Sequence, residues 1–308
     1  MSRVEESSES LVLPPARDAG LLAVAVAGVS ASGPLMAAAA APALAIAFWR
    51  NAIGAAGSGL LAGLRQRAEF AGLDRRDRTV AVVAGAFLAV HFGTWAPAVK
   101  LTSVASATAL VATQSVFAGL IAAAAGRRLP RAAWFGMALA IAGTALIAGA
   151  DVAISGRALA GDLLALIGGL ASAAYMTAGA RARRGMSAPA YTTICYGVCA
   201  LGLLVACLVG RQSLGGYSGR AWLLILAVTG CAQLLGHSLF NVVLRSVSPT
   251  AVSLAILLET PGAAVIAAVW LHQVPPISAV PGLVLLLAGL IVVVRAGGQR
   301  ADPVPDLD

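Results

Sequence analysis

The chain is an internal duplication in which each copy holds an odd number of apolar segments. Ten long apolar segments fill most of the 308 residues, and the last five repeat the first five about 146 residues later. A unit with an odd number of membrane crossings starts and ends on opposite sides, so its second copy enters the membrane upside down. The pattern predicts an all-α polytopic membrane protein with ten transmembrane helices, arranged as two inverted five-helix repeats. The offset aligns His91 with His237, Gly136 with Gly282, and Gly143 with Gly289.

Composition supports a membrane protein. Hydrophobic residues make up 59% of the chain and charged residues 11%, whereas a soluble domain carries about a quarter charged residues. Runs of about 20 apolar residues suffice to cross a hydrocarbon core of about 30 Å. Such runs are expected at 19–38, 42–64, 79–99, 104–125, 131–150, 159–180, 188–210, 220–244, 249–271 and 276–296.

These spans divide the chain into two repeats with short connections. No segment outside the membrane is long enough to fold alone, which argues against an appended catalytic domain. The first tail contains Glu5, Glu6 and Glu9 and does not resemble the basic leader of a signal peptide, so we expect the first span to remain as an anchor. The predicted parts are a tail at 1–18, a first repeat at 19–150, a linker at 151–158, a second repeat at 159–296, and a tail at 297–308.

The basic residues are distributed unevenly between the two sides of the predicted topology. The net charge is +8, and sixteen of the 21 basic residues fall on one side, many of them in the segments 65–78, 127–131 and 181–184. The positive-inside rule places that side, and with it both termini, in the cytoplasm. The charge is therefore explained by topology in a cytoplasmic membrane, and no nucleic-acid partner is needed.

Glu259 is the sharpest candidate for a functional residue. Helix 9 is expected to enter the membrane near Pro249, so Glu259 lies about 15 Å deep at about 1.5 Å per residue, near the midplane. A carboxylate there costs roughly 2.5–3.5 kcal/mol or more to insert. It would bind a substrate amine or couple transport to protons; the alternative is a buried carboxyl bonded to a neighbouring helix. Thr113, beside Gln114, occupies the equivalent position of the first repeat.

Arg50 is a charged residue inside the second span. Its guanidinium group is suited to binding a substrate carboxylate or pairing with a buried acid. The alternative is that its long stem carries the charge outward to the membrane surface. Gln114 and Tyr175 are further polar residues expected at a central cavity.

Two histidines occupy equivalent positions in helices 3 and 8. His91 with Trp95, and His237 with Asn241, are spaced so that each pair shares one helix face. A pseudo-two-fold axis would turn both faces toward one central space, where the histidines would relay protons or hydrogen-bond a polar solute. The alternative is a helix-to-helix hydrogen bond that serves packing alone.

Several stretches carry a family resemblance. The duplicated layout, Arg50 in the second helix, and the segments 136–147 (GMALAIAGTALI), 169–184 (GLASAAYMTAGARARR), 259–273 (ETPGAAVIAAVWLHQ) and 282–293 (GLVLLLAGLIVV) resemble the drug/metabolite transporter superfamily, in its EamA-type branch. The resemblance covers roughly residues 19–296. It implies a ten-helix bundle that moves small organic solutes such as amino acids, metabolites or drugs across the cytoplasmic membrane, often outward.

The sequence departs from the family pattern at two places. The acidic residue usual after the fourth and ninth helices is replaced by Arg127 or Arg128 in one copy and by Gln273 in the other. The proline usual in the fourth helix is Ser115. The paired glycines of helices 5 and 10 are expected to serve close helix packing.

Three classes of function remain open. The first is a secondary transporter, expected to export by alternating access, with protons as coupling ion through Glu259 or the histidines. The second is an uncoupled facilitator that uses the same cavity. The third, an intramembrane enzyme or receptor, is disfavoured because the chain has no nucleotide-binding loop and no HExxH or GxSxG motif. The expected partners are a small-molecule substrate and the lipid bilayer, with no cofactor and no metal.

Overall fold

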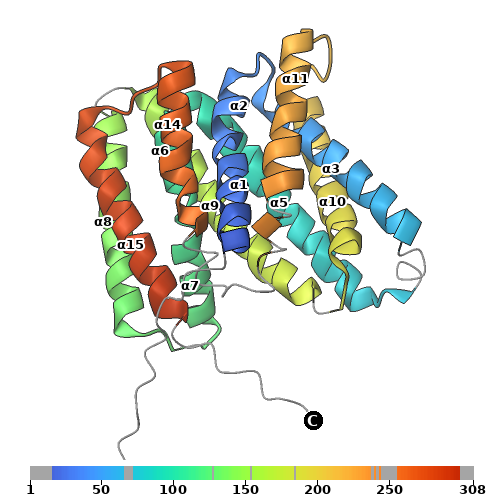
Figure 1. Cartoon of the computed structure of the whole chain (residues 1–308), viewed down its shortest axis with the longest axis horizontal. Coiled ribbons are helices and arrows are strands. Elements are labelled where there is room, and N and C mark those ends of the chain that lie inside the picture. The colour runs from blue at the N-terminus through green and yellow to red at the C-terminus, as the bar shows by residue number, and fades with distance from the viewer. Residues whose placement is uncertain are drawn as a thin grey trace, which may run out of the picture.

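The computed structural model describes residues 16–65, 72–126, 128–152, 155–183, 185–236, 239–240, 243 and 255–298. Every regular element within these residues is a helix (Figure 1). In chain order they are α1 (Ala16–Ser30), α2 (Ser32–Ala38), α3 (Ala43–Arg65), α5 (Arg75–Leu101), α6 (Val104–Val111), α7 (Gln114–Ala124), α8 (Arg131–Val152), α9 (Gly156–Ala182), α10 (Ala188–Val209), α11 (Gly219–Val228), η1 (Thr229–Gly236), α14 (Glu259–Leu271), η2 (Ile277–Ala279) and α15 (Val280–Gly298).

Eight helices within the described ranges are long and apolar enough to cross a membrane. Four of them combine two elements each: α1 with α2, α6 with α7, α11 with η1, and η2 with α15. The other two expected spans, 42–64 and 249–271, correspond to α3, which contains Arg50 and Asn51, and to a shorter apolar helix at Ala255–Leu271. The described part of the chain is therefore all-helical, with enough long apolar helices for a multi-pass membrane protein, and the count of ten crossings stays a prediction.

The fifth helix of each repeat packs directly against its counterpart. A Cβ placed at Gly136 of α8 would lie 2.8 Å from the carbonyl oxygen of Gly289 of α15, and one at Gly143 would lie 2.7 Å from that of Gly282. The two backbones are in contact, as the sequence predicted for these glycines. Residue numbers rise along α8 where they fall along α15, so the helices are antiparallel neighbours (Figure 1). Because α8 and α15 are equivalent elements, this direction supports the predicted inversion.

The remaining contacts also occur in repeat-related pairs. Extensive packing joins α5 to α9, and the equivalent contact joins α11 and η1 to α1 and α2. In the same way, α6 and α7 pack on α9, while α14 packs on α1 and α2. The second helices of the repeats, α3 and α10, pack on each other. In each of these pairs, a helix of the first repeat packs against a helix of the second repeat.

Two helices are interrupted three residues before a proline. The first helix is interrupted at Ala31, between α1 and α2 and ahead of Pro34, and the ninth helix is interrupted at Leu258, ahead of Pro261. A proline ring clashes with the carbonyl of the residue four positions earlier and provides no N–H. For Pro34 that carbonyl belongs to Ser30, where α1 stops. A proline inside a membrane helix is tolerated where neighbouring groups or a wet cavity satisfy the carbonyl that loses its N–H partner.

The fourth helix is interrupted without a proline. Thr113 lies between α6 and α7 and donates a hydrogen bond from Oγ1 to the carbonyl of Leu110 at 2.6 Å. Such local side-chain bonds compete with the helical ladder. Gly169 of α9 comes close to this site, since a Cβ there would lie 3.0 Å from the carbonyl oxygen of Val111. The break thus persists although Ser115 replaces the family proline.

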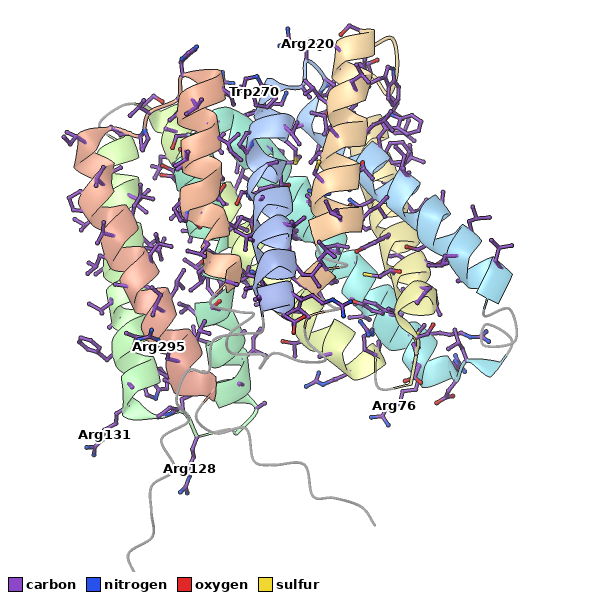
Figure 2. The ribbon with its side chains drawn as sticks, viewed as in Figure 1. Arg76, Arg128, Arg131, Arg220, Trp270 and Arg295 are labelled. Carbon is purple, nitrogen blue, oxygen red and sulfur yellow. The ribbon has the colours of Figure 1, made fainter. Side chains whose placement is uncertain are left out.

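The two ends of the bundle differ in charge. Arg76, Arg128, Arg131 and Arg295 lie at one end, which we call the basic end, while Arg220 and Trp270 lie at the opposite end (Figure 2). The segregation agrees with the uneven distribution of basic residues along the sequence.

Candidate functional site

Arg50 is the centre of a buried polar network between the two repeats. Its side chain, on α3, is 3% exposed. Nε donates a hydrogen bond to Oε1 of Gln233 at 2.8 Å, and Nη1 donates one to Oγ of Ser32 at 3.0 Å. Both bonds hold the guanidinium inside the bundle, so the alternative that Arg50 extends outward to the membrane surface is wrong.

Both partners of Arg50 come from irregular helix segments. Ser32 is the first residue of α2, immediately after the interruption of the first helix. Gln233 lies in η1, a π-helical segment, whose wider turn is rare and occurs often at functional sites. Gly54, one turn after Arg50, makes room for the amide, because a Cβ there would lie 2.6 Å from Nε2 of Gln233. The interruption before α2 and the π-helical turn of η1 therefore bring Ser32 and Gln233 within hydrogen-bonding distance of the same guanidinium group.

Aromatic rings cover another side of Arg50. The guanidinium carbon lies 4.7 Å from the ring centre of Phe92 on α5, within the range of a cation–π contact. The ring of His91 lies edge-on to Phe92 at 4.8 Å and is stacked on Trp95 at 6.0 Å between centres. Sequence analysis named His91 and Trp95 but not Phe92, because a search for polar residues passes over an apolar ring.

His91 is held in one orientation by the neighbouring repeat. Its Nδ1 lies 2.9 Å from the carbonyl oxygen of Gly168 on α9. A carbonyl only accepts, so Nδ1 carries the proton in this arrangement and Nε2 is the nitrogen left for another partner. The hydrogen bond between α5 and α9 gives His91 the packing role that sequence analysis kept as an alternative, while its second nitrogen remains available.

Glu259 is the first residue of α14, directly after the interruption of the ninth helix. The N-terminus of a helix favours a negative charge. Glu259 is half-buried and close enough to Arg50 for an electrostatic interaction, yet no direct hydrogen bond or ion pair joins it to another described side chain. One turn later, Gly262 packs against the hydroxyl of Ser30, so the two proline-associated interruptions lie against each other.

The other two candidate polar residues of the described chain belong to α7 and α9. Gln114 is the first residue of α7, and its Oε1 accepts a hydrogen bond from the hydroxyl of Ser172. Tyr175 is half-buried on α9, near Tyr196 of α10, the repeat counterpart of Arg50. Both residues therefore face helices of the second repeat, but neither bonds directly to Arg50.

His237 and Asn241 lie outside the described residues, as does Arg127. The predicted convergence of the two histidines on one central space therefore stays a prediction. Cys195, Cys199 and Cys207 are buried and unpaired, and no three potential metal ligands come together within the described ranges.

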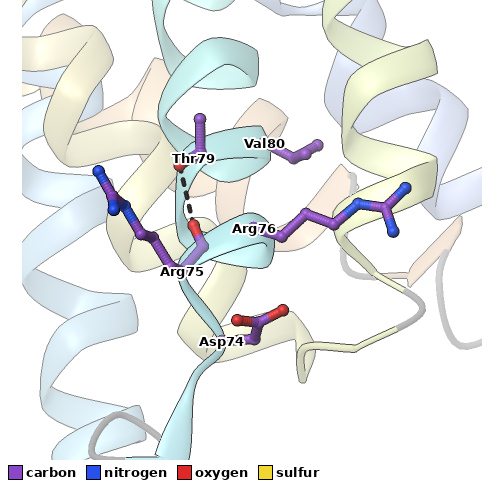
Figure 3. A pocket seen from close by; sticks show the side chains of 5 residues that line it. All are labelled: Asp74, Arg75, Arg76, Thr79 and Val80. Carbon is purple, nitrogen blue, oxygen red and sulfur yellow. Dashed lines mark hydrogen bonds between the residues drawn. The ribbon is translucent and has the colours of Figure 1, made fainter.

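A surface depression of about 460 Å³ lies at the basic end of the bundle, apart from the Arg50 network. It is lined by Asp74, Arg75, Arg76, Thr79 and Val80 at the start of α5 (Figure 3). Both arginines are exposed, and Thr79 uses its hydroxyl to donate to the carbonyl of Arg75 at 2.8 Å. Nothing there combines burial with unsatisfied polar groups, so we take the Arg50 network as the candidate site.

Comparison with known proteins bears on the identity of this bundle. The model of the EamA-like transporter family matches residues 19–149 and again residues 159–295. The chain belongs to the EamA-like transporter family. The family match confirms the resemblance to the drug/metabolite transporter superfamily and makes this EamA-like protein a multi-pass membrane transporter.

Solved structures support the same fold for this EamA-like transporter. One, described as "Crystal structure of protein", aligns with a TM-score of 0.62 at 18% sequence identity, covering 92% of this chain and 99% of the other. At that identity the likeness concerns the fold alone. A search of the curated proteins found no match.

Proposed function

We propose that this EamA-like transporter is a secondary transporter that exports small organic solutes across the cytoplasmic membrane by alternating access, with the Arg50 network as its substrate site. The observation that carries the proposal is the bond between Arg50 of the first repeat and Gln233 of the second. Transporters built from inverted repeats place their substrate site near the bilayer midplane, at the interface of the repeats.

The interrupted helices support alternating access. The breaks of the fourth and ninth helices lie at equivalent positions, Thr113 and Leu258–Glu259. Discontinuous helices present free backbone groups and helix termini to a substrate, and small changes at the breaks allow one half to rock against the other. The antiparallel α8–α15 pair has backbone contacts at its four paired glycines and would stay fixed while the site opens to either side.

We propose protons as the coupling ion, with Glu259 as the titrating group. An intramembrane carboxylate that makes no direct ion pair can change its protonation state without breaking a buried salt bridge. We propose export as the direction of transport because members of the drug/metabolite transporter superfamily are often exporters. The basic end is taken as cytoplasmic, which places both termini there.

Reconstitution into liposomes tests the proposal. Purified protein should accumulate or expel a labelled small organic solute when a pH gradient is applied, and do so more slowly without the gradient. Equal flux with and without the gradient would favour the uncoupled facilitator. Complete absence of flux for amino acids, amines and organic cations would remove transport of these classes and revive a receptor or enzyme.

A further inference from the structure

Lys100 holds the ends of two helices together at one end of the bundle. It is the only lysine of the chain and lies in the last turn of α5, at the end opposite the basic end, which we call the outer end (Figure 2). Its Nζ donates hydrogen bonds to the carbonyl oxygens of Ala39 at 2.6 Å and Ala41 at 2.9 Å. Ala39 caps the C-terminus of α2, where helix carbonyls lack intrahelical donors and attract a cation. Charge-assisted bonds of this kind are roughly twice as strong as neutral ones.

The helices α2 and α5 belong to different groups. One group, the α9 group, consists of α5, α6, α7 and α9, and the other, the α1 group, consists of α1, α2, α11, η1 and α14; packing is extensive within each. The two groups are equivalent under the inversion of the repeats. They meet at Arg50, whose partners Ser32 and Gln233 belong to the α1 group while Phe92 belongs to the α9 group. Lys100 therefore bonds one group to the other.

Two further contacts join the helices at the outer end. The backbone N–H of Val104, at the start of α6, donates to Oε1 of Gln273, just after α14, at 3.4 Å. Trp49 of α3 donates from Nε1 to the carbonyl oxygen of Leu214 at 2.9 Å, and its ring lies edge-on to that of Trp222 on α11 at 5.1 Å between centres. The loop that carries Leu214 connects α10 to α11, so these contacts tie α3 to the α1 group.

The basic end carries different residues at the equivalent positions. Inversion of the second copy places the counterparts of outer residues at the basic end, and the offset of 146 residues pairs Lys100 with Ser246 and Trp49 with Cys195. Neither Ser nor Cys carries an N–H donor on its side chain. The two ends therefore differ in the contacts that these positions can form, although the fold is duplicated.

We propose that Lys100 is the latch of an outer gate, with Trp49 as a second, weaker latch, and that the empty transporter therefore rests closed to the outside. This inference rests on the proposed alternating access and names the contact that controls it. A latch at one end alone stabilises the arrangement in which that end is shut. For an exporter, this arrangement leaves the cytoplasmic side as the side from which solute enters. Opening outward requires Lys100 to release both carbonyls at the end of the first helix.

Two pairs of spin labels report the two ends of the bundle. The outer pair is Arg157→Cys at the start of α9 with Arg220→Cys at the start of α11, and the inner pair is Arg76→Cys on α5 with Arg17→Cys on α1. All four positions are exposed, and each pair joins one group to the other. The four native cysteines are replaced by alanine in every protein. Double electron–electron resonance then gives both distances, with and without the latch variants.

Removing the latch should open the outer end. Lys100→Met keeps the length of the side chain and removes all its donors, so the ratio of outward-open to outward-closed protein should rise at least tenfold, the effect of one charge-assisted bond or more. Trp49→Phe removes one neutral bond, and the same ratio should rise about fivefold. Each increase appears as a longer outer distance together with a shorter inner distance.

Two controls match these variants. Arg211→Met removes an exposed cation at the same end, and Trp222→Phe shortens an indole that makes only ring contacts with the described residues. Both should change the ratio less than twofold. Unchanged distances in Lys100→Met combined with Trp49→Phe overturn the latch. If Lys100→Met does not fold, the comparison of Trp49→Phe with Trp222→Phe decides the question.

The two distances also separate this inference from the proposed function. A longer outer distance with an unchanged inner distance would support the latch and count against alternating access, because the two ends would not move reciprocally. Unchanged distances in the latch variants, together with solute flux in liposomes, would leave transport standing and overturn the latch.

Discussion

Arg50 and Gln233 are joined by a hydrogen bond of 2.8 Å, although 183 residues separate them along the chain. The bond links the second helix of the chain, in the first repeat, to the eighth helix of the chain, in the second repeat. It also explains how a guanidinium group is accommodated at 3% exposure in an apolar bundle: each of its bonded nitrogens has a neutral acceptor on a neighbouring helix.

The Arg50–Gln233 bond should contribute measurably to stability. Gln233→Leu removes the acceptor and leaves Nε of Arg50 unsatisfied, at a cost of about 1.5–3 kcal/mol. The matched control is Gln212→Leu, because Oε1 of Gln212 is buried without a partner among the described residues, so its removal breaks no hydrogen bond to that oxygen. Thermal unfolding in detergent should show a lower midpoint for the first variant only. Equal midpoints would indicate that the bond makes no net contribution.

Glu259 should govern coupling to protons. Glu259→Gln keeps the shape of the side chain while removing its titration, so the variant should fold and still exchange solute but lose accumulation driven by a pH gradient. Binding of a solute with an ammonium group should weaken as well. Flux in liposomes at several external pH values gives the measurement. Gradient-driven accumulation with the parent pH dependence would rule out this role.

The α8–α15 contact should tolerate no added side chain. Gly143→Ala places a methyl group against the backbone of Leu286 and 2.7 Å from the carbonyl oxygen of Gly282. Overpacking of this kind costs about 1–3 kcal/mol. Gly149→Ala on the same helix has nothing within 4 Å of the new methyl group and should be neutral or stabilising by about 0.5–1 kcal/mol. Unfolding midpoints of the two variants should therefore change in opposite directions, or only the first should fall.

The basic end should face the cytoplasm. In a background in which the four native cysteines are replaced by alanine, Arg76→Cys should resist a membrane-impermeant thiol reagent added to intact cells. Gly215→Cys, in the loop at the opposite end, should react, since this glycine is exposed with nothing within 4 Å of an added Cβ. The reverse pattern of labelling would show that the topology is inverted.

The sequence by itself determined the architecture of this protein to a large extent. A membrane-spanning helix needs an apolar run of a certain length, and Lys and Arg are more frequent in cytoplasmic loops than in outer loops. Both features belong to short stretches of sequence, so they can be recognised without knowing the tertiary contacts. The duplicated glycines at 136, 143, 282 and 289 predicted close helix packing, and the structure shows that α8 and α15 pack on each other through them. A proline by itself does not decide where a helix breaks, because Pro34 and Pro261 follow interruptions whereas Pro97 lies inside the continuous helix α5.

Only the tertiary structure decided how the charged and polar residues are used. The position of Arg50 in an apolar run is visible in the sequence, but its inward orientation depends on Gln233 and Ser32, whose approach requires a π-helical turn and an interrupted helix on other parts of the chain. No proline marks the break at Thr113 in the sequence. The break depends on the hydrogen bond from the Thr113 hydroxyl to the carbonyl of Leu110 and on the close contact with Gly169. Hydropathy reports the environment that a residue needs; the partner that satisfies a buried polar group is set by helix packing between distant segments.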